Sequence, residues 1–95
     1  MRESALQAEC MRLCKRLDVL AVNVHGSGWS NKGFPDLLLF HAGKAVAVEL
    51  KADSGYKPQP DQVVWRNRFL RQEIPHHFVR GLDEFEAVVR EEFQL

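Results

Sequence analysis

Two acidic residues and a lysine stand out in this sequence because their types and spacing suit metal chemistry. They are Asp36, Glu49 and Lys51. If Glu49 lies on a strand, Lys51 points to the same face two residues further on, and the preceding residues on that face are small alanines. Two facing carboxylates with a nearby ammonium group and open space are the parts of a divalent-metal site with a charge-stabilising lysine.

A hairpin between the two acidic residues would bring them face to face. Apolar runs over residues 37–40 and 45–48 predict two strands, and Gly43 can supply the positive φ of the turn between them. A turn centred on the Ala–Gly step puts Asp36 directly opposite Glu49. Opposed Cβ atoms in an antiparallel pair lie about 4.5–5.5 Å apart, so two like charges there repel unless positive charge lies between them.

The elements that position these groups follow from the hydrophobic periodicity. The sequence predicts helices over residues 3–17 and 60–72, strands over 20–24 and 76–80, and a final amphipathic helix that begins near Asp83. The order is helix, three strands, helix, strand, helix, which is an α/β arrangement around a small mixed sheet flanked by helices. Because the last strand follows a helix, we expect it to run parallel to an earlier strand after a right-handed crossover.

Length and composition set the class of protein. The chain has 95 residues, so we expect one domain over residues 1–95. Its formal net charge is +0, which excludes a basic footprint spread over the whole chain. No apolar run approaches the roughly 18 residues of a membrane span, and the N-terminus lacks the apolar core of a secretory signal. We therefore expect a cytoplasmic protein without a membrane partner.

Several other polar residues have more than one interpretation. Glu3 lies about 60° from Leu6 on the first predicted helix, towards its inward side, although an acidic residue there also suits the helix dipole. The second helix carries the densest positive charge, which is either a solvated face or a phosphate-contacting surface, at Arg66, Arg68 and Arg71. Neighbouring strand residues His76 and His77 should point to opposite faces.

The two cysteines, Cys10 and Cys14, lie one turn apart on the first predicted helix. That spacing is poor for a disulfide, and no second Cys or His pair follows at zinc-finger spacing. We expect buried, reduced cysteines that behave as small apolar side chains.

The string Pro35-Asp36 followed by Glu49-Leu50-Lys51 resembles the signature of the PD-(D/E)xK nuclease superfamily, and the predicted element order matches its restriction-endonuclease-like αβββαβ core with an extra C-terminal helix. One branch, the virus-type replication-repair nuclease (VRR-NUC) domain, is similar in more detail. Residues 33–37 read GFPDL and match its GxPDL motif. Two further pairs match this branch, Gln62 with Trp65 and Glu3 with Gln7.

The resemblance implies a role for each matching residue. Asp36 and Glu49 would bind Mg²⁺ or Mn²⁺ with the backbone carbonyl of Leu50, and Glu3 would complete the acidic cluster directly or through water. Lys51 would position the attacking water or stabilise charge on the phosphate, and Gln62 would orient Lys51 or a phosphate. No organic cofactor is expected.

The implied function is a metal-dependent, structure-specific DNA endonuclease that resolves four-way (Holliday) junctions. Two symmetric cuts need two sites, so a homodimer is expected, with an interface on the last helix or near Trp29. The alternatives are a flap-directed or restriction-type nuclease subunit and a non-catalytic nucleic-acid-binding module. The family suggests a bacterial or phage-encoded protein.

Overall fold

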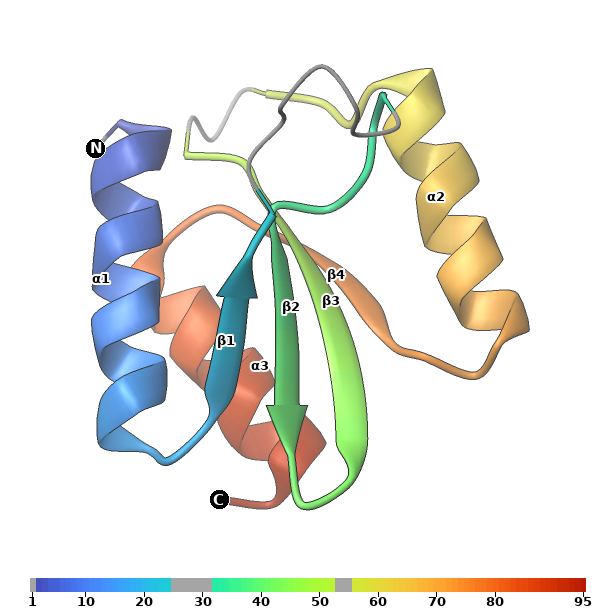
Figure 1. Ribbon diagram of the computed structural model, residues 1–95. Coiled ribbons are helices and arrows are strands. Elements are labelled where there is room, and N and C mark those ends of the chain that lie inside the picture. Colours follow the sequence, from blue (N-terminus) through green and yellow to red (C-terminus); the bar gives the residue numbers. More distant parts are fainter. Residues whose placement is uncertain (1, 25–31, 53–55) are drawn as a thin grey trace.

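The computed structural model describes residues 2–24, 32–52 and 56–95. Its elements follow the predicted order: α1 (Glu3–Arg16), β1 (Leu20–Asn23), β2 (Leu37–His41), β3 (Lys44–Leu50), α2 (Pro60–Arg71), β4 (His76–Val79) and α3 (Leu82–Phe93). The strands form one sheet in the order β1-β2-β3-β4 (Figure 1). β1 pairs with β2 and β2 with β3 in antiparallel directions, whereas β4 is parallel to β3, so the predicted mixed sheet is confirmed.

Several element ends lie one residue earlier than the periodicity predicts. α1 ends at Arg16 because the chain turns at Asp18, whose φ of 59° is left-handed. β1 ends at Asn23, although the N–H of Val24 still donates to the carbonyl of Asp36 at 2.9 Å. The other early ends are those of α2 and β4.

The β2–β3 hairpin has the predicted register. His41 pairs with Lys44, and the pairing continues to Leu37 opposite Val48. The turn has two successive positive φ values, 50° at Ala42 and 83° at Gly43, as in the tight turns that match the twist of a hairpin. One further step in this register places Asp36 opposite Glu49.

One face of the sheet carries the hydrophobic core. α1 and α3 cover this face, and the residues they bury include Leu37, Leu39, Val46 and Val48 of the hairpin. Cys10 and Cys14 are fully buried free cysteines, as expected, and burial raises their pKa values to about 12 and about 11. Three apolar residues of α3 are also buried, namely Phe85, Val89 and Phe93, whereas Leu82 and Val88 are only partly buried.

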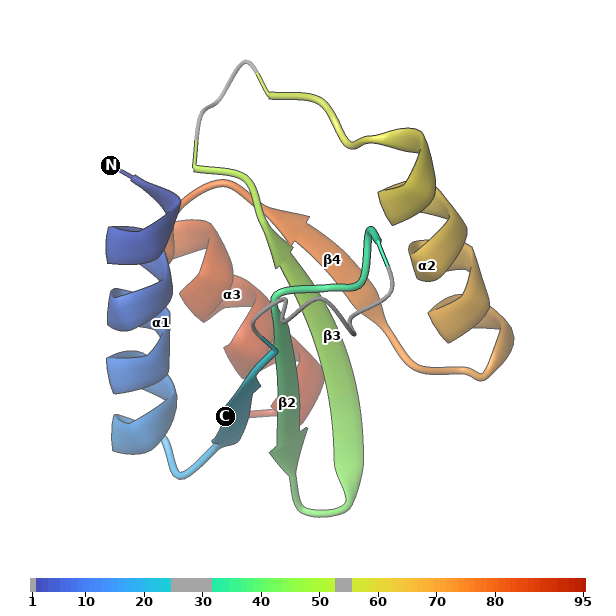
Figure 2. The same cartoon turned by 45° about the horizontal axis from the view of Figure 1, so that its top comes forward.

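The other face of the sheet is only partly covered. α2 lies beside β4 and buries none of its own residues (Figure 2). An aromatic cluster attaches it to the rest of the molecule through the ring pairs Phe34–Trp65, Phe34–Phe69 and Phe69–His76. Towards β1 this face is open, and apolar side chains remain exposed there: Leu20 (64%), Val22 (42%) and Phe40 (37%).

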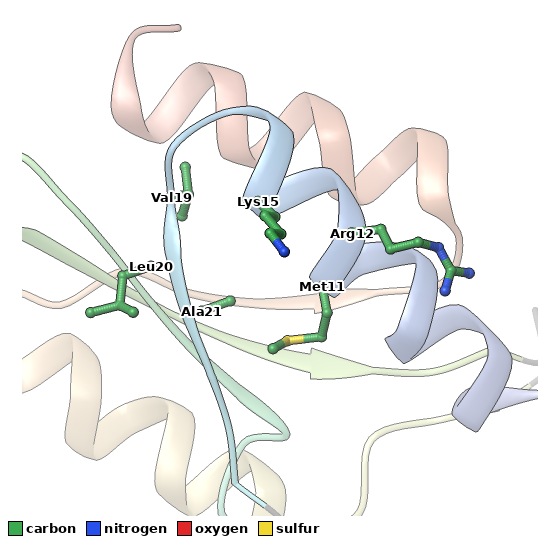
Figure 3. Close-up of a pocket in the computed structure, with 6 residues that line it drawn as sticks. All are labelled: Met11, Arg12, Lys15, Val19, Leu20 and Ala21. Carbon is green, nitrogen blue, oxygen red and sulfur yellow. The ribbon is translucent and has the colours of Figure 1, made fainter.

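A hollow of about 350 Å³ lies between α1 and β1 (Figure 3). It is lined by Met11, Arg12, Lys15, Val19, Leu20 and Ala21. No acidic residue lines it, so it is not the site predicted from the sequence. Within the described part of the chain, every helix is too short or too polar to cross a membrane.

Candidate active site

The segment that carries Asp36 is fixed against α2 (Figure 2). Gly33 has a φ of +86°, and a Cβ there would come within 2.6 Å of the backbone carbon of Asp61. The indole Nε1 of Trp65 donates to the carbonyl of Lys32 at 3.1 Å. These contacts hold residues 32–35 against the first turns of α2, and buried Pro35 then leads directly into Asp36.

Asp36 and Glu49 are in direct contact where β2 begins and β3 ends. The N–H of Leu50 donates to Oδ2 of Asp36 at 2.8 Å. Glu49 is 5% exposed and its pKa is raised to about 9. Burial is the main cause, and a hydrogen bond with Asp36 and the charge of Asp36 add to it. The carboxyl group of Glu49 therefore retains its proton at neutral pH in the protein alone.

Lys51 lies beside this pair and is 3% exposed. Its charge lowers the pKa of Glu49 and so opposes the effect of Asp36. The ammonium nitrogen lies 4.5 Å from the ring centroid of Tyr56, in a cation–π contact. Its backbone N–H donates to the carbonyl of Val79 at 2.7 Å, which ties the end of β3 to β4.

Glu3 and Gln62 are placed differently from these three residues. Glu3 is exposed in the first turn of α1, yet its charge contributes to the raised pKa of Glu49. The side-chain oxygen of Gln62 accepts the N–H of Gln59 at 2.8 Å, within a capping box at the start of α2. Trp29, the other position expected for the dimer interface, lies outside the described residues.

Solved structures provide the comparison with known proteins, since no protein-family model matches the sequence and no curated protein matches it. A structure described as a VRR_NUC domain is 26% identical, with a TM-score of 0.78, and the match covers 93% of this chain and 94% of that one. A VRR_NUC domain protein is 18% identical over 100% of this chain and 90% of that chain, with a TM-score of 0.82. The chain has a VRR-NUC-like nuclease fold.

A more distant structure widens the comparison. It is Hjc, a Holliday junction resolvase of the archaeal hyperthermophile Archaeoglobus fulgidus, at 16% identity and a TM-score of 0.62, over 81% of this chain and 67% of that chain. The predicted restriction-endonuclease-like α/β fold is therefore confirmed.

The carboxylate oxygens of Asp36 and Glu49, where β2 begins and β3 ends, are of the type that binds hard divalent cations. Mg²⁺ usually binds through one or two carboxylates and keeps several waters. Asp36 and Glu49 supply two carboxylates. Burial first, and then the hydrogen bond and charge of Asp36, raise the pKa of Glu49, and a bound cation would act to lower it. In residues 2–24, 32–52 and 56–95, no group of three or more His, Cys, Asp or Glu side chains could hold a metal. The structure thus brings two carboxylates together without a third.

The adjacent histidines of β4 point to opposite faces, as predicted. His76 is 7% exposed on the α2 side, where neither ring nitrogen has a hydrogen-bond partner among the described residues. Nε2 of His77 lies 2.6 Å from Oε2 of Glu92 in α3, on the other face.

Two contacts at the site were not foreseen from the sequence. Tyr56 covers Lys51, and the only local signal was an aromatic residue in the loop that follows β3. The approach of Gly33 to α2 was also missed, although a glycine before Pro-Asp is the residue type that such a close contact requires.

Proposed function

We propose that this chain is a metal-dependent, structure-specific DNA endonuclease that hydrolyses phosphodiester bonds in four-way (Holliday) junctions. The observation that carries the proposal is the buried contact between Asp36 and Glu49, with Lys51 beside it. Two adjacent carboxylates are costly to bury unless a positive charge joins them. The solved VRR_NUC domains and Hjc, which have the same fold, support a nuclease.

Each residue has a defined part in this proposal. Asp36, Glu49 and the carbonyl of Leu50 would hold Mg²⁺ or Mn²⁺, and Glu3 would contribute directly or through bound water from the start of α1. When bound, the cation lowers the pKa of a water and stabilises negative charge on the phosphate. The ammonium group of Lys51 stands ready to position that water or to interact with the phosphate. Gln62 acts from the start of α2, with its amide nitrogen available because its oxygen caps the helix.

The homodimer belongs to the same proposal because two symmetric cuts need two sites. The open sheet face is our candidate interface, since Leu20, Val22 and Phe40 are exposed there, whereas the largest apolar side chains of α3, Phe85 and Phe93, are buried. The change Val22→Lys should convert the dimer to a monomer and remove paired cutting of junctions. Light scattering that finds a monomeric wild-type protein with intact junction cleavage would contradict the dimer.

Site variants test the chemistry. Asp36→Ala and Glu49→Ala should lose both metal binding and cleavage, whereas Lys51→Ala should lose cleavage and still bind metal. Calorimetric titration with Mg²⁺ beside a cleavage assay measures both properties. Full activity of the Asp36→Ala variant would show that Asp36 is not a metal ligand of the active site.

A panel of substrates tests the specificity. Matched linear duplex, flap, splayed-arm and four-way DNA are each digested with Mg²⁺, and the four-way junction should be cut fastest. Preferred cutting of the flap would replace the junction assignment, and equal cutting of all four would remove structure specificity. Binding without any cutting would identify a non-catalytic nucleic-acid-binding module.

A further inference from the structure

The three arginines of α2 have no carboxylate partner among the described residues. Elsewhere, four basic side chains each contact an acidic one: Arg12 with Glu9, Lys32 with Asp61, Lys44 with Glu92 and Arg90 with Glu86. The nearest polar partner of Arg66 is the neutral side chain of Asn67, at 3.3 Å. The guanidinium groups of Arg66, Arg68 and Arg71 are therefore available to an anion.

Arg68 is held in place on the side of α2 that bears Trp65. Its guanidinium carbon lies 4.7 Å from the Trp65 ring centroid. Trp65 in turn donates to the carbonyl of Lys32, on the segment that leads to Asp36. The stack restricts the arginine without neutralising it, and a guanidinium held in this way loses less entropy when it binds a phosphate.

The net charge of +0 is unevenly divided between the two faces of the sheet. α2 carries one acidic residue and three arginines, whereas α3 carries five acidic residues and one arginine. Asp36 and Glu49 lie on the α2 side, because they alternate with core-facing Leu37, Val48 and Leu50. A polyanion that reaches the carboxylates from this side avoids the acidic helix.

We propose that Arg66, Arg68 and Arg71 form a phosphate-binding surface on α2 that holds the DNA backbone beside the Asp36–Glu49 pair. The inference rests on the nuclease function proposed above and adds the surface that binds the substrate. Its contacts are with phosphates, so it binds junctions and duplexes without reading their sequence.

DNA binding measured against salt tests this surface. Fluorescence anisotropy with a labelled four-way junction, in EDTA to prevent cleavage, gives the slope of log affinity against log salt concentration. We compare the wild-type chain with the triple variant Arg66→Ala, Arg68→Ala, Arg71→Ala. The matched control is Arg12→Ala, Lys15→Ala, Arg16→Ala, which removes the same charge from α1. Circular dichroism and thermal melting establish that each variant is folded.

The α2 variant should reduce the magnitude of the slope by about 2 to 3, because each phosphate contact contributes about 0.9. The control should leave it nearly unchanged, and Arg→Lys at the three α2 positions should retain most of it. Equal reductions by both alanine variants, or none by the α2 variant, would overturn the inference. If the wild-type chain cuts DNA and the α2 variant binds DNA with the wild-type affinity and salt dependence, only the proposed surface is wrong. If the wild-type chain binds DNA through α2 but does not cut it, the proposed nuclease function is wrong and the surface stands.

Discussion

α2 and α3 are helices of 12 residues each on opposite faces of the same sheet, and they differ in almost every other property. α3 buries Phe85, Val89 and Phe93 in the core, whereas α2 buries no residue. α2 instead contacts the segment that leads to Asp36, and its three arginines have no carboxylate partner among the described residues. The difference indicates that α3 contributes more to the hydrophobic core than α2. The role that we propose for α2 is to position the segment before Asp36 and to contact the substrate.

The largest expected contrast concerns one phenylalanine from each helix. Phe85→Ala should lower the free energy of unfolding by about 3–5 kcal/mol, because it leaves a cavity in a fully buried position. Phe69→Ala should cost about half as much or less, since this ring is only partly buried. Urea denaturation measures both values. Equal losses would mean that α2 stabilises the fold as strongly as α3.

Lowering the pH should reduce the stability of the fold through His76, which lies on the α2 side of the sheet. Burial is the main reason that the pKa of His76 is lowered from 6.5 to about 4. Between these values the unfolded chain binds more protons than the folded one, so stability falls as the pH drops from 6.5 towards 4. The expected loss is about 3 kcal/mol.

Urea midpoints at pH 7 and pH 4.5 measure this loss, and His76→Phe should remove most of the difference. The variant His77→Gln is the control because His77 faces α3. If His76→Phe leaves the pH dependence intact, another group is responsible.

A comparison of Gly33 with Gly43 separates the effect of the contact with α2 from that of backbone strain. Both glycines have a similar positive φ, but only Gly33 lies against α2. Gly43→Ala should cost about 1–2 kcal/mol, because its φ is +83° and, beyond its two chain neighbours, no heavy atom of the described residues lies within 4 Å of the added Cβ. Gly33→Ala should cost roughly 1–3 kcal/mol more, since its Cβ would meet the backbone of Asp61. It should also slow cleavage by displacing Asp36, which Gly43→Ala should not do. Thermal melts and cleavage rates distinguish the two, and identical behaviour would show that α2 does not position the segment.

The smallest expected effect lies on the α3 side, at Glu92. Burial acts to raise its pKa, but hydrogen bonds from His77 and Lys44 outweigh it, so the pKa lies below its usual value of 4.5. This carboxylate therefore stabilises the fold above about pH 4.5, and the contribution is lost as the pH falls further. Glu92→Gln should cost about 1 kcal/mol at pH 7 and much less in strong acid. A pH-independent cost would indicate that packing, rather than charge, is responsible.

The sequence was most informative where local rules decide the structure. The hairpin register followed from the period of two and from a turn that requires positive φ, so the opposition of Asp36 and Glu49 could be predicted. Gln62 lies three residues after Gln59, at the spacing of a capping box, but the N-cap residue of that sequence pattern is Ser or Thr, so the hydrogen bond that Gln62 makes in the helix cap was not predictable from it.

What the sequence could not predict depends on tertiary contacts. Gly33 touches Asp61, and Trp65 binds the carbonyl of Lys32, across more than 25 residues of intervening chain. The partial cover of the sheet by α2 is also a property of packing, because a helix with an apolar stripe is normally expected to be buried. The exposed apolar residues of β1 and β2 follow from that incomplete cover.

The hydrogen bond from Leu50 to Asp36 affects which oxygen this aspartate would offer to the proposed cation. One of its two oxygens, Oδ2, already accepts the N–H at the end of β3. In the metal site that we propose, the other oxygen of Asp36 would be the freer ligand, and binding through this one oxygen would suit Mg²⁺, which usually takes one or two carboxylates and keeps several waters. In the variant Asp36→Asn, the amide oxygen would still accept the N–H of Leu50, while the amide nitrogen would face the cation. This variant would therefore separate the structural role of Asp36 from its proposed role as a metal ligand.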